Sequence, residues 1–209
     1  MPNTSEACSS ELIASLHHQP LLVVLRAEQP SALTPQIDRL AALGLRHIEI
    51  AWSDHPAWIE QTRALALRSP EVCFGAASIT TDRALSDVQA AGLSFAVSPV
   101  LDPALLARAQ QLELTLVPGV LSPTEVHQAK VLGCSLVKLY PASAVGPGYW
   151  RSLAGPLGGL PFCIAAGGLA PAQVAQWLSS GVDAVAIGGA LSGDQAWQEL
   201  AQWLTSPRG

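Results

Sequence analysis

The stretch GLRHIEIAW, residues 44–52, joins a glycine to a short apolar strand that begins three residues later. A glycine at such a place ends a helix in the left-handed conformation that other residues avoid. The same spacing recurs at Gly92, Gly133 and Gly181, which precede apolar runs in the same way. This repeat predicts a chain built from successive units of helix and strand.

Short runs rich in Val, Ile and Leu alternate with segments of helical period along the whole chain. The expected strands span 21–26, 47–52, 72–78, 95–99, 114–118, 136–141, 162–166 and 184–188. Amphipathic helices are expected at 31–43, 55–67, 82–91, 103–111, 122–132, 171–180 and 194–204. Strands that alternate with helices form a parallel sheet. We therefore predict an α/β fold, a single (β/α)8 TIM barrel.

A further helix is expected over residues 5–17, where it would close the amino-terminal end of the barrel. No Ser- or Gly-rich linker interrupts the sequence, so we expect one domain over residues 1–209. Hydrophobic residues make up 49% of the chain and charged residues 13%, as suits a sheet covered on both faces.

The charge pattern limits the partners. The formal net charge is −5 and no run of Lys or Arg occurs, which argues against nucleic acid or an anionic membrane as a partner. The first residues lack the pattern of a signal peptide, and no apolar stretch is long enough to span a membrane. We expect a cytoplasmic protein that binds a small molecule through local groups.

Neither a metal nor an organic cofactor is expected. The four cysteines have no CxxC spacing, and three of them lie in or beside apolar segments where reduced, buried thiols are common. The five histidines show no ligand-like spacing with one another or with carboxylates. The sequence has no GxSxG, P-loop or dinucleotide-binding fingerprint.

One of the two lysines stands where a charge is costly. Lys130 lies on a polar helical stretch, whereas Lys138 lies within the apolar run 136–141. Because side chains alternate along a strand, Val137 and Leu139 can pack under the helices while Lys138 points into the barrel. Burial disfavours the ammonium form and so makes a neutral, nucleophilic amine available, as Schiff-base enzymes require. We interpret Lys138 as a catalytic nucleophile.

Glu49 repeats this pattern on the second strand. Ile48 and Ile50 fall on the helix side, Glu49 falls on the inner side, and the small Ala51 leaves room above it. A buried ion pair between Lys138 and Glu49 that only fixes the strand register is the structural alternative. We favour a catalytic role for Glu49.

Further candidates for ligand binding follow three other strands. Arg26 ends the first strand, at the carboxyl end where barrel active sites form, and can hold a carboxylate in bidentate fashion. A surface salt bridge is the alternative for Arg26. Gly167 and Gly168 follow the seventh strand, and Gly188 and Gly189 follow the eighth, where barrels bind phosphate through backbone N–H groups. Tight turns also use glycine, but both pairs together favour an anion cradle.

Six motifs in order carry a family resemblance. They are IEIAWS at 48–53, GAAS at 75–78, AVSP at 96–99, LVPGV at 116–120, LVKLYPAS at 136–143 and AAGG at 165–168. In these motifs the chain resembles the class I 2-keto-3-deoxy-6-phosphogluconate and 4-hydroxy-2-oxoglutarate aldolase family over nearly the whole barrel. The first-strand LR and the segment PASAVGPGYW are similar to the branch that acts on 2-keto-3-deoxy-6-phosphogalactonate.

The resemblance implies a role for four residues. Lys138 would be the Schiff-base lysine and Glu49 the general acid/base. Ser78 stands where the family usually has threonine, and Pro99 would shape the pocket. The resemblance also implies a homotrimer.

Two positions depart from the family pattern. Ser53 stands where the phosphogluconate-type enzymes have an arginine, and Ala190 stands where they have a serine that contacts phosphate. Arg26 could take over the carboxylate, and glycine amides could still hold a phosphate. The small-molecule 2-oxo acid substrate is therefore expected either with a phosphate or without one, as in 4-hydroxy-2-oxoglutarate.

The implied reaction is an aldol cleavage. Lys138 forms an imine with the C2 carbonyl, Glu49 moves protons, and the bond between C3 and C4 breaks to give pyruvate and an aldehyde. Three alternatives remain open on the same scaffold. They are oxaloacetate decarboxylation at the same imine, a phosphosugar isomerase or synthase, and a noncatalytic binding barrel.

Overall fold

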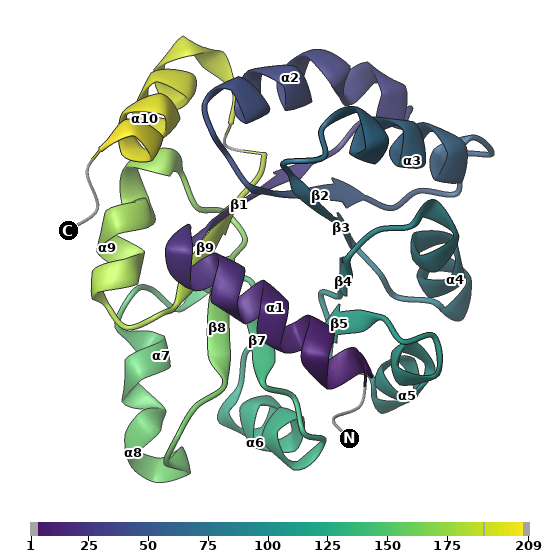
Figure 1. Ribbon diagram of the computed structural model, residues 1–209. Helices are drawn as coiled ribbons and strands as arrows, with labels where there is room; N and C mark the ends of the chain where they lie inside the picture. Colours follow the sequence, from purple (N-terminus) through teal and green to yellow (C-terminus); the bar gives the residue numbers. More distant parts are fainter. Residues whose placement is uncertain (1–3, 190, 207–209) are drawn as a thin grey trace.

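Figure 1 shows a ring of strands surrounded by helices, in a computed structural model that describes residues 4–189 and 191–206. The strands are β1 (Leu21–Leu25), β2 (His47–Ala51), β3 (Cys73–Ala77), β4 (Phe95–Val97), β5 (Thr115–Val117), β6 (Gly119–Val120), β7 (Leu136–Leu139), β8 (Phe162–Ala166) and β9 (Ala184–Ile187). All of them pair in parallel, in the order β5-β4-β3-β2-β1-β9-β8-β7-β6.

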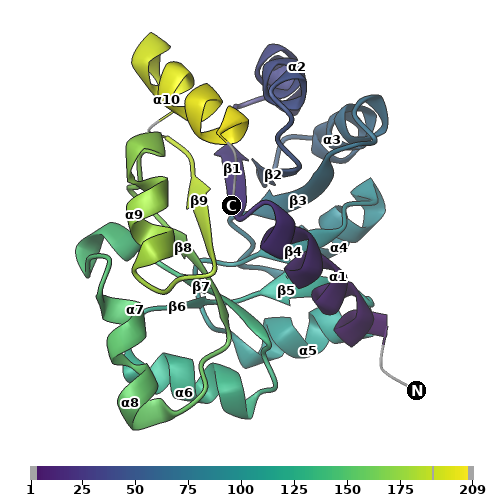
Figure 2. The same ribbon diagram turned by 60° about the vertical axis from the view of Figure 1, so that its left-hand side comes forward.

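The α-helices lie outside the strands in both Figure 1 and Figure 2, except for α1. They are α1 (Thr4–His18), α2 (Thr34–Ala42), α3 (Trp58–Arg68), α4 (Asp82–Ala91), α5 (Pro103–Gln111), α6 (Pro123–Val131), α7 (Tyr149–Ser152), α8 (Ala154–Leu157), α9 (Val174–Ser179) and α10 (Gly193–Thr205). Each crossover therefore returns the chain to the same end of the sheet, which puts all the carboxyl ends of the strands together.

The fifth expected strand, 114–118, corresponds to β5, and a further strand, β6, begins directly after Pro118. β5 pairs with β4, and β6 pairs with β7 on the other side. Proline has no N–H to donate, so the ladder is interrupted there, although the Pro118 carbonyl still accepts from the Lys138 N–H over 2.9 Å. β5 and β6 are the two ends of the sheet order, and the single residue between them closes the barrel. The predicted (β/α)8 barrel is confirmed.

The amino-terminal helix α1 lies across one end of the barrel, as Figure 1 shows. Its Leu12 and Leu16 pack in one buried cluster with inward-facing strand residues, among them Leu22 and Phe162. The prediction of an extra helix that closes the amino-terminal end is confirmed, with bounds slightly wider than 5–17.

Side chains alternate on the strands as predicted. Ile48 and Val137 belong to the apolar layer between the strands and the outer helices. The inner cluster is formed by other strand positions, such as Val97 and Ile164. Charged residues at the inner positions of β2 and β7 therefore lie inside the barrel. Apolar packing and α1 close one end of the barrel, so a ligand can enter at the carboxyl ends of the strands.

The connection between β7 and β8 was not predicted. It contains a 3₁₀ helix, Ala142–Ala144, followed by the short helices α7 and α8. Glycine and proline at 146–148 interrupt any helical period there. The predicted helices at 31–43 and 171–180 also begin as 3₁₀ turns, Pro30–Leu33 and Pro171–Gln173, because proline sets their first residue.

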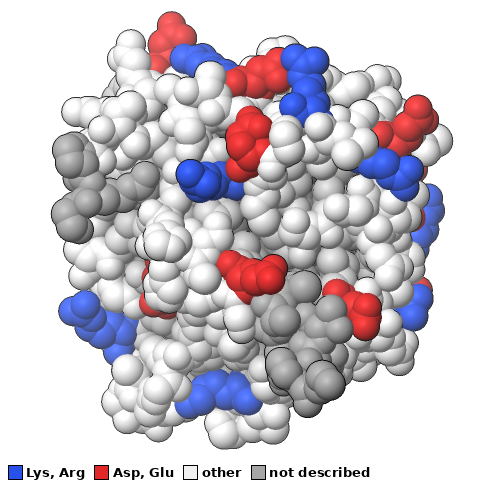
Figure 3. Space-filling model, viewed as in Figure 1, with Lys and Arg blue, Asp and Glu red and all other residues white. Residues whose placement is uncertain are grey.

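Acidic and basic side chains are interspersed on the α1 face of the molecule, as Figure 3 shows. Across the described residues, no helix has both the length and the apolar character needed to cross a lipid bilayer.

Candidate active site

A cavity of about 290 Å³ opens at the carboxyl ends of the strands. It is lined by Val24, Arg26, Ala77, Ser78, Pro99, Lys138, Tyr140, Ala166, Gly167, Gly168, Leu169, Ala186, Gly188 and Gly189. The volume is near the lower end of the roughly 300–1,000 Å³ typical of small-molecule sites. Every predicted substrate-binding residue lines this cavity, together with Lys138, although these residues come from six parts of the chain.

Lys138 lies on β7 with its flanking residues Val137 and Leu139 fully buried. The lysine itself is 6% exposed, and that exposure is to the cavity. Its Nζ atom lies 5.0 Å from the centroid of the Tyr140 ring. The structure thus presents a buried amine to a small cavity, as a Schiff-base site requires.

Glu49 lies on β2, is 0% exposed and does not line the cavity wall. Both of its carboxylate oxygens are buried without a hydrogen-bond partner among the described residues. Burial raises the pKa of this carboxyl group, and the positive charge of Lys138 opposes that change. Among the described residues, Lys138 and Glu49 form no ion pair with each other. The register-fixing ion pair considered as an alternative is therefore not formed.

Arg26 and Ser78 meet at the mouth of the cavity. The Arg26 Nη2 group donates a hydrogen bond to Ser78 Oγ over 3.0 Å. Ser78 has a φ angle of 68°, a left-handed conformation that is uncommon outside glycine and frequent at functional sites. The described residues include no ion-pair partner for Arg26, so the surface salt bridge is not formed.

The two glycine pairs have different structural reasons for lacking a side chain. Gly167 and Gly168 have φ angles of 95° and 75°, which other residues rarely adopt. A Cβ atom on Gly188 would lie 3.4 Å from Val24, and one on Gly189 would meet nothing within 4 Å. The second pair therefore leaves its backbone open to the cavity. Ala190, which follows it, lies outside the described residues.

Six lining residues were not predicted, namely Val24, Ala77, Tyr140, Ala166, Leu169 and Ala186. Among them, Tyr140 stands two residues after Lys138, just past the end of β7, and Val24, on β1, stands two residues before Arg26. The two-residue spacing was the signal that could have found them. Ser53 does not line the cavity, and its Oγ atom is buried without a partner among the described residues.

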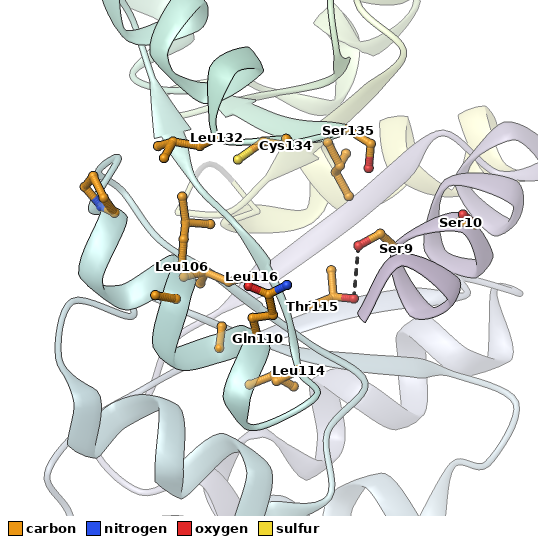
Figure 4. Close-up of a pocket in the computed structure, with 15 residues that line it drawn as sticks. Ser9, Ser10, Leu106, Gln110, Leu114, Thr115, Leu116, Leu132, Cys134 and Ser135 are labelled. Atoms are coloured by element: carbon orange, nitrogen blue, oxygen red, sulfur yellow. Dashed lines mark hydrogen bonds between the residues drawn. The ribbon is translucent and has the colours of Figure 1, made fainter. Parts of the chain in front are cut away.

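A larger cavity, of about 480 Å³, lies at the other end of the barrel between α1, α5 and the end of α6. Figure 4 shows its uncharged lining, with Ser9 hydrogen-bonded to Thr115 over 3.3 Å and Gln110, Cys134 and Ser135 nearby. Active sites of barrels lie at the carboxyl ends of the strands, and this cavity lies beside their amino ends. We therefore assign the chemistry to the smaller cavity.

Three of the cysteines are outside the site. Cys73, Cys134 and Cys163 are free thiols. Burial raises the pKa of each of them, that of Cys134 to about 11, so they stay protonated and unreactive at neutral pH. Within residues 4–189 and 191–206, no three or more His, Cys, Asp and Glu side chains gather in a metal-type cluster.

Comparison with known proteins agrees with this geometry. The model of the family described as KDPG and KHG aldolase matches residues 12–205. The KHG/KDPG aldolase of Escherichia coli strain K12 is 31% identical over 161 residues, which are 77% of this chain and 73% of that protein. The 2-dehydro-3-deoxy-6-phosphogalactonate aldolase of the same strain is 25% identical over 170 residues, 81% of this chain and 82% of that one.

A solved structure is similar over almost the whole barrel. It is the KDPG aldolase of Legionella pneumophila with pyruvate captured at low pH as a covalent carbinolamine intermediate. That chain has a TM-score of 0.76 and 26% sequence identity, with 92% of this chain and 95% of that one covered. The family resemblance predicted from the sequence is confirmed, and the protein belongs to the KDPG and KHG aldolase family of carbon–carbon lyases.

Proposed function

We propose that the protein is a class I aldolase that cleaves a 2-keto-3-deoxy-6-phospho sugar acid, 4-hydroxy-2-oxoglutarate or both to pyruvate and an aldehyde. The observation that carries the proposal is the buried Lys138, whose amine opens on a small cavity beside an unpaired, buried Glu49. Pyruvate bound as a carbinolamine in the Legionella relative is the first covalent intermediate of this chemistry.

In the proposed reaction, Lys138 attacks the C2 carbonyl carbon of the 2-oxo acid as a neutral amine. The carbinolamine then loses water and becomes a protonated imine. When the C4 hydroxyl loses its proton, the electron pair of the bond between C3 and C4 moves into the imine, leaving an aldehyde and an enamine. Protonation of the enamine at C3 and addition of water release pyruvate and regenerate the amine.

Glu49 is proposed as the group that moves these protons, through water. A general acid/base works best when its pKa lies near the working pH. Burial raises the pKa of Glu49 from that of an ordinary glutamate, which brings it toward this range. Its oxygens have no hydrogen-bond partner among the described residues, so both can accept a hydrogen bond from a water molecule.

The ends of the substrate are assigned from the two sides of the cavity. Arg26 and Ser78, which are already joined by a hydrogen bond, would hold the carboxylate beside C2. The backbone at Gly167, Gly168, Gly188 and Gly189 would hold a phosphate at the far end. Pro99, from the end of β4, shapes the wall between them.

Reductive trapping tests the central step. Incubation with pyruvate and borohydride is expected to add a stable pyruvyl group to Lys138 in the wild type. Peptide mass spectrometry is expected to find no modified residue in Lys138→Ala. Lys130→Arg is the matched control, because Lys130 is the other lysine and its Nζ is bonded to the Leu157 carbonyl over 2.6 Å. No adduct on a folded wild type would overturn the proposal.

A substrate panel settles the finer assignment. Rates of pyruvate release from 2-keto-3-deoxy-6-phosphogluconate, its galactonate epimer and 4-hydroxy-2-oxoglutarate would rank the substrates. Oxaloacetate belongs in the panel because the same imine can accept electrons from a carboxylate that leaves as carbon dioxide.

We also propose that three copies of the chain form a homotrimer, as the family resemblance implies. Val131 and Leu132, at the end of α6, are 72% and 42% exposed, and an interface would cover this apolar surface. Light scattering is expected to give three times the chain mass of 21.8 kDa, and a monomer mass would contradict the proposal. The cytoplasmic location stays a prediction.

A further inference from the structure

Tyr140 stands two residues after Lys138, just past the end of β7. Its side chain lines the cavity and is 39% exposed. The Lys138 Nζ atom lies over the ring at 5.0 Å from its centroid, within the roughly 6 Å over which an aromatic face attracts a cation. The residue next to the reacting amine is therefore an electron-rich surface.

Gly167, just past the end of the neighbouring strand β8, leaves the space that this ring occupies. A Cβ atom on Gly167 would lie 2.9 Å from both Cδ2 and Cε2 of Tyr140 and 3.1 Å from Cα of Pro141. Any side chain there would push the ring or the backbone beside it. Gly167 is thus required by the ring contact as well as by its φ angle of 95°.

We propose that the Tyr140 ring holds the positive charge of the imine formed at Lys138, and that Gly167 is a positioning residue for the ring. This inference rests on the proposed function. In that reaction the nitrogen is positive in the imine that accepts the electrons of the breaking bond, and neutral in the attacking amine and in the enamine. An attraction for positive charge at this atom keeps the imine protonated until the bond breaks.

The other charged groups around the amine make this attraction useful. Arg26, from β1, lies in the same cavity and repels a positive imine. Glu49, from β2, attracts the positive imine while its carboxyl group is ionised. In the proposed reaction Glu49 is neutral at each step in which it carries a proton, and the attraction is then lost. The ring attracts the imine in every one of these states, so it stabilises the charge independently of the proton cycle.

A ring that attracts the charge affects how imine formation depends on pH, and not only how much imine forms. Removal of the ring favours the neutral forms of the nitrogen, so the amine attacks at lower pH and the imine loses its proton at lower pH. Both limbs of a pH profile of pyruvate trapping therefore move toward acid. A typical attraction of this kind predicts a displacement of roughly half to one and a half pH units.

The experiment measures cyanoborohydride trapping of pyruvate against pH, in the wild type, Tyr140→Phe and Tyr140→Leu. Phenylalanine keeps the ring and is expected to keep the wild-type profile, whereas leucine keeps the apolar volume without the ring and is expected to show the displaced profile. Gly167→Ala, which pushes the ring, is expected to move the profile in the same direction. Gly92→Ala, at the end of α4 with a φ angle of 75° and nothing within 4 Å, controls for backbone strain.

The outcomes separate the two proposals. A trapped wild type with a displaced Tyr140→Leu profile and an unchanged Tyr140→Phe profile supports the inference. A reduced amount of adduct at unchanged pH dependence in Tyr140→Leu would mean a packing role and overturn it, as would equal displacement in Tyr140→Phe. No adduct in the wild type at any pH would overturn the proposed function and this inference together.

Discussion

The Arg26 guanidinium and the Ser78 hydroxyl, 3.0 Å apart, join the ends of β1 and β3 across the intervening β2. Ser78 takes part in this bond from a left-handed conformation, with a φ angle of 68°. This conformation is uncommon outside glycine, and it places the hydroxyl beside a cation at the mouth of the cavity. We therefore predict that the pair binds the carboxylate of the substrate.

Arg26→Lys tests whether the guanidinium group binds the carboxylate. Lysine keeps the charge but loses the planar fork that bonds a carboxylate twice, and a lost bond to a charged group typically weakens binding by about 1.5–3 kcal/mol. We expect kcat/KM for a 2-oxo acid to fall roughly tenfold to a hundredfold, mainly through KM. Steady-state kinetics with Arg108→Lys, whose side chain is paired with Asp82 on the surface, provide the control. An unchanged KM in Arg26→Lys would place the carboxylate elsewhere.

Glu49→Gln is expected to leave the barrel folded and to slow the reaction. Glutamine has nearly the same shape but cannot carry a proton between substrate and water. Removal of a general acid/base typically costs about 10²- to 10⁴-fold in rate. We expect kcat for aldol cleavage to fall by such a factor, while pyruvate is still trapped on Lys138 at a slower rate. A variant with wild-type kcat would remove Glu49 from the mechanism.

The same substitution has a pH-dependent effect on stability. The unfolded glutamate titrates near its ordinary value of 4.5, and burial raises the pKa of the folded one. Between those two values the folded state binds more protons, so the wild type loses stability as the pH rises. Glu49→Gln has no carboxyl group at this position, so it does not lose this stability. The Tm of the variant minus the Tm of the wild type is therefore expected to increase as the pH rises above 4.5. A constant difference in Tm would contradict the assignment.

The inner and outer faces of the strands were predictable from the sequence. In a sheet covered by helices, apolar residues pack under the helices, so a charged residue between them must point to the inner side. Lys138 and Glu49 were found in this way. Tyr140 was not found, since an aromatic residue at an inner position is also ordinary core packing. The break at Pro118 and the contact between Gly167 and the Tyr140 ring depend on how strands far apart in the chain meet, which periodicity does not determine.

Gly168→Ala examines the far end of the cavity. Gly168 and Gly92 share a φ angle of 75°, so alanine imposes a similar backbone strain at both. At Gly168 alone, the new Cβ atom would lie 2.5 Å from the Ser143 hydroxyl oxygen. We expect Gly92→Ala to lose about 1 kcal/mol in urea unfolding from backbone strain alone, and Gly168→Ala to lose at least as much because of the added clash. Only Gly168→Ala is expected to lose kcat/KM for a phosphorylated substrate. Equal kinetics in both variants would argue against a phosphate at these glycines.

His47 connects α1 to the barrel and should make the fold sensitive to acid. It is fully buried, with Nδ1 3.3 Å from the Leu21 carbonyl and Nε2 2.8 Å from Ser15 Oγ. Because the carbonyl only accepts, Nδ1 carries the proton of the neutral ring. Burial is the main reason that the pKa of His47 falls from 6.5 to about 4, and the charge of Arg46 lowers it further.

The sign of the effect follows from proton binding. Between pH 6.5 and about 4 the unfolded chain binds a proton that the folded chain refuses, so stability falls as the pH falls. The difference of about 2.5 pH units corresponds to about 3 kcal/mol lost by pH 4. His47→Gln is expected to be less stable at pH 7, since it loses packing, but to show a flatter decline in the urea midpoint toward pH 4. His127→Gln, exposed on α6, should decline like the wild type, and parallel declines in all three proteins would show that His47 does not control the response to acid.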